Sequence, residues 1–153
     1  MTQERLIKQH MFVTRFLLAI TIAALLVFIG LYIDETHRVQ ETYRTQFNTY
    51  LSNTDASIDS YLNAEGDLPL RYRRIITDLS NANAFAFLLN DMTEDQKRTI
   101  NELYTCFLKY PEQMQDTARL NDVRTAVSDM SENLDKGYDE AAEIVDSVDK
   151  KGF

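Results

Sequence analysis

Residues 12–33 read FVTRFLLAITIAALLVFIGLYI, and this apolar stretch sets the organisation of the whole chain. From Phe16 to Ile33, 18 residues pass without a charge. As an α-helix, the 22 residues of the stretch would be about 33 Å long, enough to cross a hydrocarbon core of about 30 Å. Arg15 lies near one end, where an arginine extends its guanidinium to the lipid headgroups. The sequence therefore predicts a transmembrane helix over residues 12–33.

The charges on the two sides of this stretch predict its orientation. Residues 1–15 carry three basic residues and one acid, a net charge of +2, whereas Asp34 and Glu35 open the other side. By the positive-inside rule, the basic tail 1–11 is cytoplasmic and residues 34–153 lie outside. The sequence thus predicts a single-pass protein of the cell membrane. The tail charges are Arg5, Lys8 and Arg15 against Glu4.

A cleaved signal peptide is the alternative interpretation of the same stretch. Such peptides have an apolar region of about 7–15 residues that ends in a small-x-small cleavage site. Here the segment from Phe28 to Ile33 contains no such site, and the apolar region is longer. These features favour an uncleaved signal anchor.

Residues 34–153 are strongly acidic. Removing the three basic residues and Glu4 of the tail from the chain totals of 16 and 24 leaves 13 basic and 23 acidic residues, a net charge of −10. Such a surface is repelled by phosphates, which argues against a nucleic-acid partner. The single cysteine, Cys106, excludes an internal disulfide framework, and the length allows one modest domain beside the anchor.

Apolar residues at three- and four-residue steps predict that this segment is all-α. The helical blocks lie at about 34–63, 70–89, 93–110 and 112–149, separated at Gly66–Pro69, Asn90–Asp91 and Pro111. Thr93 and Gln96 have the spacing of a capping box. Short turns between amphipathic blocks favour an antiparallel, up-down four-helix bundle in which the first block continues the membrane helix. The alternative, a long two-chain coiled coil, conflicts with the interruptions.

The fourth block has the most regular heptad spacing, from Leu120 to Val148. As one helix, its 38 residues would span about 57 Å, too long to fit the other three. A break is therefore expected near Lys136-Gly137-Tyr138, because glycine weakens a helix and Asp139 is a suitable cap.

Two features of the second block are candidate partner-binding sites. Arg71, Arg73 and Arg74 form the only basic cluster of residues 34–153. They could bind an acidic partner, but pairing with the acids of the last block is the preferred interpretation. Such surface pairs contribute only about 0–1 kcal/mol each. Farther along, Phe85, Phe87 and Leu88 are apolar on every side of one helical turn, which predicts either a partner contact or a buried helix end. Phe87 is expected to be exposed in the isolated domain.

Small side chains in the membrane stretch allow another helix to approach closely. The stretch consists mostly of Leu, Ile and Phe, and Thr21, Ala23 and Ala24 are the predicted contacts with a companion helix. The companion is another membrane protein or a second copy of this chain.

No residue pattern predicts catalysis, a cofactor or a bound metal. Asp34 and His37 resemble half of a di-metal carboxylate site, but no second Glu-x-x-His follows. No nucleophile elbow or phosphate-binding glycine loop occurs either. Cys106 shares a face with Leu103 and Phe107 and is expected to be a buried, unreactive thiol.

These observations leave two classes of function. The first is a non-enzymatic scaffold or accessory subunit that is anchored in the lipid bilayer and presents a helical bundle outside to other membrane proteins. The second is a sensor or adaptor whose bundle binds a ligand and signals through a partner. In layout the chain resembles the input half of bacterial chemoreceptors and sensor kinases, which implies such a role. A metal- or thiol-dependent enzyme has the weakest support.

Overall fold

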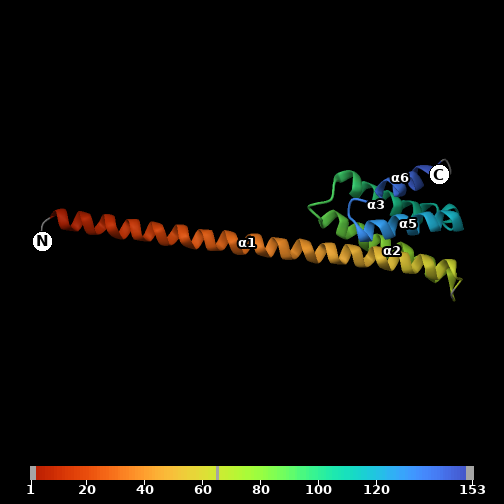
Figure 1. Cartoon of the computed structure of the whole chain (residues 1–153), viewed down its shortest axis with the longest axis horizontal. Coiled ribbons are helices and arrows are strands. Elements are labelled where there is room, and N and C mark those ends of the chain that lie inside the picture. The colour runs from red at the N-terminus through yellow and green to blue at the C-terminus, as the bar shows by residue number, and fades with distance from the viewer. Residues whose placement is uncertain (1–2, 65, 151–153) are drawn as a thin grey trace. The chain divides into compact units, whose positions relative to one another are not determined.

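The structure is a computed structural model that describes residues 3–64 and 66–150, and this part of the chain is helical without a strand. The helices are α1 (Gln3–Leu62), α2 (Leu68–Leu88), α3 (Glu94–Lys109), α4 (Pro111–Met114), α5 (Thr117–Glu132) and α6 (Tyr138–Ser147), as labelled in Figure 1. The chain divides into two compact units, residues 1–39 and residues 40–153. The predicted tail charges Glu4 and Arg5 lie outside the side chains that the structure describes.

The first unit consists of the N-terminal part of α1. Every residue from 10 to 38 is exposed, and His10–Leu62 of α1 contains one segment that is long and apolar enough to cross a membrane, with a mean hydropathy of 2.8. Its polar hydroxyls are satisfied within the helix: Thr14 donates to the His10 carbonyl at 2.8 Å and Thr21 to that of Leu17 at 3.0 Å. Such bonds let a hydroxyl remain in an apolar environment without an external partner.

The second unit begins with the part of α1 from Gln40 onward, and α2 packs against it. Ser57 donates a hydrogen bond to Asp78 at 3.0 Å, and the rings of Tyr61 and Tyr72 lie 6.0 Å apart. The partner number on α2 falls as the number on α1 rises, so the two helices are antiparallel. Asp67 caps α2 by accepting from the Leu70 amide, which was not predicted, and Pro69 lies in the first turn of the helix.

Helix α3 lies antiparallel to α2 on the other side. The buried Tyr72 hydroxyl donates to the Phe107 carbonyl at 2.8 Å, while Asn83 donates to Asn101 at 3.2 Å. The predicted capping box is confirmed: Thr93 accepts from the Gln96 amide, and the Gln96 side chain accepts from the Thr93 amide. The capping box therefore fixes where α3 begins, and the hydrogen bonds between α2 and α3 fix how the two helices are aligned.

The remaining helices close the packing around the core. Helix α6 packs between α3 and α5, and α5 reaches α1 through Arg124, which bonds Asp55 at 2.9 Å and Asp59 at 2.5 Å. Figure 1 shows these helices gathered along the C-terminal part of α1. The buried side chains of these helices thus pack together in one hydrophobic core. The largest fully buried side chains include Phe47, Leu51, Ile58, Ile75, Leu79, Ile100, Leu103, Phe107, Leu120 and Met130.

The fourth predicted block is divided into three helices. The expected break near Gly137 is confirmed, since α5 ends at Glu132 and α6 begins at Tyr138. The expected cap is wrong: Gly137 itself, with φ +80°, precedes the helix, and no side chain caps it. Asp139 lies inside the first turn instead, where its charge favours the helix dipole. A second break, before Asp116, was not predicted.

Asp78 gives the folded domain a pH dependence. Burial raises the pKa of Asp78 above its usual 3.8, against the opposing effects of the Ser57 hydrogen bond and the Arg74 charge. The folded protein therefore holds this proton more tightly than the unfolded chain does. Stability should fall as the pH rises from about 3.8 through the folded-state pKa, and then stay level.

Asp78→Asn keeps an acceptor for Ser57 and removes the charge. We expect this variant to gain stability relative to the wild type as the pH rises from acidic to neutral, measured by urea unfolding across that range. If the free energy of unfolding changes with pH in the same way for both proteins, Asp78 does not cause the pH dependence of stability.

Candidate interaction surfaces

Two exposed apolar residues stand at the end of α2, and we call Phe87 and Leu88 the apolar tip. Phe87 is 54% exposed and Leu88 46% exposed, so the prediction that Phe87 faces outward is confirmed. For Phe85 the structure agrees with the alternative, a helix end packed against the core. Its ring is partly buried against α1, 5.7 Å from Tyr50 and 6.1 Å from Tyr43. Two tyrosines of α1 lie against its ring, so Phe85 contributes to the core packing.

Hydrogen bonds from α1 hold the backbone of the apolar tip in place. The Gln40 side chain donates to the Leu88 carbonyl at 3.1 Å and accepts from the Asn90 amide at 2.9 Å. Leu89 and Met92, on either side of the turn, are buried. The backbone of the turn is therefore fixed to α1, and the exposure of the tip is a property of the folded domain.

Ion pairs surround the same end of the domain. Arg44 of α1 pairs with Asp91, which directly follows the turn. In the first turns of α3, Lys97 pairs with Glu94 at 3.1 Å and Arg98 with Asp95 at 2.6 Å. The Arg44 and Arg98 pairs are exposed and add little to stability, while Lys97 is largely buried; all three pairs cancel local charge next to the tip.

The outward face of α2 carries the predicted basic cluster. Arg73 and Arg74 are exposed, and neither forms a salt bridge with any residue of 3–64 or 66–150. Their expected pairing with the acids of the last block is thus not formed, because α2 contacts α1 and α3 while those acids lie on α5 and α6. Arg71 differs: it is half-buried and has an interaction of its own. Leu70, one turn before Arg74, is 51% exposed on the same face.

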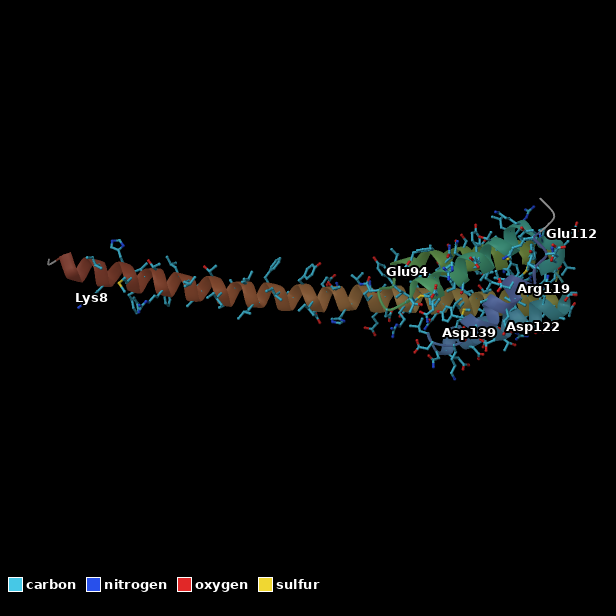
Figure 2. All side chains as sticks on the ribbon, turned by 90° about the horizontal axis from the view of Figure 1, so that it is seen from above. Lys8, Glu94, Glu112, Arg119, Asp122 and Asp139 are labelled. Atoms are coloured by element: carbon cyan, nitrogen blue, oxygen red, sulfur yellow. The ribbon has the colours of Figure 1, made fainter. Side chains whose placement is uncertain are left out.

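The acids are spread over the rest of the surface. Figure 2 labels Glu94, Glu112, Asp122 and Asp139, which come from α3, α4, α5 and α6 in turn, and all four are exposed. Against this acidic background, the outward face of α2 carries the exposed Arg73 and Arg74 and has no exposed acid between Leu70 and Leu88.

The three residues predicted to contact a companion helix do not share one face. At about 100° per residue, Thr21 and Ala24 lie about 60° apart, whereas Ala23 lies about 160° from Thr21. Ala19, Ala23 and Gly30 fall instead on one narrow stripe. A close contact with another helix would therefore use either Thr21 with Ala24, or Ala23 with Ala19 and Gly30. It could not use Thr21, Ala23 and Ala24 together.

A polar hollow of about 570 Å³ lies between the start of α3 and the start of α6. Its lining includes Arg98, Lys136 and the uncapped first residues of α6. The Tyr138 hydroxyl beside it is buried without a hydrogen-bond partner among the described residues, and burial raises the pKa of this tyrosine. The hollow is thus polar and of mixed charge.

Neither the thiol nor the acids form a recognisable chemical centre. Cys106 is buried, and burial raises its pKa, which keeps the thiol protonated and unreactive. Within the described residues, no three His, Cys, Asp or Glu side chains gather closely enough to hold a metal ion. Comparison of the chain with protein-family models, curated proteins and solved structures found no match. Its function must therefore be inferred from its own residues.

Proposed function

We propose that the chain is a non-enzymatic, single-pass membrane protein whose helical domain, an up-and-down bundle with a divided fourth element, acts outside the membrane as a scaffold or accessory subunit. One observation carries the proposal: residues 16–33 of α1 are uncharged and exposed on every side. An apolar helix that no protein covers requires an apolar surrounding, and this one has the length of a bilayer. The basic tail favours a cytoplasmic N-terminus.

The partner surface that we propose is the outward face of α2. Arg73 and Arg74 are available for carboxylates, since both are exposed and neither forms a salt bridge in the described part of the chain; the Arg74 charge also acts on the half-buried Asp78. Leu70 adds an exposed apolar contact beside them. Arginines flanked by apolar side chains are common among residues that dominate binding energies. The partner is thus expected to be a membrane protein with an acidic surface outside the membrane.

Reversing the two charges tests this surface. We expect Arg73→Glu/Arg74→Glu to weaken partner capture from detergent-solubilised membranes by about tenfold or more. The control, Arg98→Glu/Lys109→Glu, changes the net charge equally at two exposed positions of α3 and should leave capture intact. Equal loss in both variants would mean that bulk charge, not this face, governs the association.

The polar hollow between α3 and α6 favours a sensor as the second candidate function. Its volume of about 570 Å³ lies in the range of small-molecule sites, about 300–1,000 Å³. A small polar ligand bound there would raise the melting temperature of the full chain by mass action. Replacing Lys136 with Glu should abolish that rise if the hollow is the binding site.

A further inference from the structure

The apolar tip is bonded to Gln40, the first residue of the second unit, which follows the apolar stretch closely along the chain. Gln40 holds the tip through the Leu88 carbonyl and the Asn90 amide. Only seven residues, about 10 Å of helix, separate Gln40 from Ile33, the last residue of the apolar stretch. In Figure 1 the turn after α2, drawn in green, lies beside the part of α1 around residue 40. The tip therefore belongs to the end of the domain that the chain tethers to the membrane.

The charges at this end fit a lipid surface better than the rest of the domain does. The acids nearest the tip in the sequence, Asp91, Glu94 and Asp95, are each paired with a basic side chain. On the chain segment that follows the apolar stretch, Glu35 is paired with Arg38 at 2.8 Å, whereas Asp34 and Glu41 are exposed and form no salt bridge with the described residues. Neutralisation of the acids next to the tip removes the repulsion that these acids would meet at an anionic headgroup layer.

The composition of the tip also suits this environment. Phenylalanine and leucine are the side chains that interfacial helices bury about 5–10 Å into the boundary between headgroups and acyl chains. The tip presents one of each on a backbone already fixed by hydrogen bonds, so inserting them requires no further ordering.

We propose that Phe87 and Leu88 insert into the headgroup region of the membrane that α1 crosses, so that the domain rests on the bilayer at a second point. This proposal rests on the proposed membrane anchoring. Such a contact would fix the height and the rotation of the domain about α1, and with them the direction in which the outward face of α2 is presented to a partner.

Tryptophan fluorescence tests the insertion directly, because the chain has no Trp. We would place single tryptophans in the full chain as Phe87→Trp, Leu108→Trp and Phe28→Trp. Leu108 matches Phe87 in exposure, at 54% each, but lies about 21 Å farther along α3 from its start. Phe28 belongs to the membrane stretch and is 68% exposed. Each variant would be reconstituted into phosphatidylcholine vesicles with and without a lipid that carries a quencher near the headgroup.

The proposal predicts a blue-shifted, quenched emission for Phe87→Trp and an unshifted, unquenched emission for Leu108→Trp. Leu88→Trp is a second probe of the tip and should behave like Phe87→Trp. Blue-shifted emission of Phe28→Trp establishes the anchor independently. If Phe28→Trp is blue-shifted while Phe87→Trp matches Leu108→Trp, tip insertion is refuted and the tip is left for a protein partner. If Phe28→Trp emits as in water, the membrane anchoring itself fails, and the tip proposal with it.

Discussion

Replacing Gly137 with alanine is expected to destabilise the helical domain by about 2–5 kcal/mol. Gly137 has φ +80°, and a Cβ added there would lie 2.2 Å from the Ala126 carbonyl oxygen and 3.0 Å from Met130 Cγ. The oxygen belongs to the backbone of α5, so relief requires α5 and α6 to separate. Since a domain of this size is stable by only about 5–15 kcal/mol, the loss would be a large fraction of the total.

Gly66 provides the matched control. It also has a positive φ, +70°, but a Cβ added there meets nothing within 4 Å. Gly66→Ala should therefore cost only the backbone strain, about 1 kcal/mol. Urea unfolding of the full chain in detergent, followed by the near-ultraviolet circular dichroism of the tyrosines, measures both. Similar losses for the two variants would contradict the close packing of α6 on α5.

Placing two arginines at the centre of the apolar stretch is expected to release the chain from the membrane. Leu, Ile, Phe and Val fill 12 of the 18 positions from Phe16 to Ile33, which favours insertion by about 4–7 kcal/mol. Leu25→Arg/Leu26→Arg removes two of these and adds an opposing cost of about 5–7 kcal/mol. Insertion would then no longer be favourable.

Membrane fractionation with an alkaline wash measures this effect. The double arginine variant should appear in the soluble fraction, whereas Leu25→Ala/Leu26→Ala should remain in the membrane pellet. Retention of the arginine variant in the washed pellet would mean that something other than this stretch holds the protein there.

Periodic apolar residues predicted most of the core. The seam from Leu120 to Val148 is buried in the fold as the heptad spacing indicated, with Leu134 partly so. The capping box at Thr93 and the start of α2 were also predictable, because they depend on residues adjacent in the sequence. Local chemistry and helical period were enough for these features.

Contacts between distant residues could not be predicted in the same way. Phe85 seemed equivalent to Phe87 because both belong to one apolar turn, and only the positions of Tyr43 and Tyr50 on α1 decide that Phe85 is covered. The Gln40 bonds to the turn after α2 have no sequence signal, since glutamine is common on exposed helical faces. The arginines of α2 lack the acids of the last block as partners because α5 and α6 pack on α1 and α3.

The central claim, an anchor with its domain outside the membrane, is tested most directly by cysteine labelling in intact cells. The buried Cys106, whose pKa burial raises, should react slowly and leave a low background. Ser52→Cys and Lys8→Cys place exposed thiols on the two sides of the apolar stretch. We expect a membrane-impermeant maleimide to label Ser52→Cys in intact cells and Lys8→Cys only after permeabilisation. Labelling of Lys8→Cys in intact cells with protection of Ser52→Cys would contradict the proposed orientation.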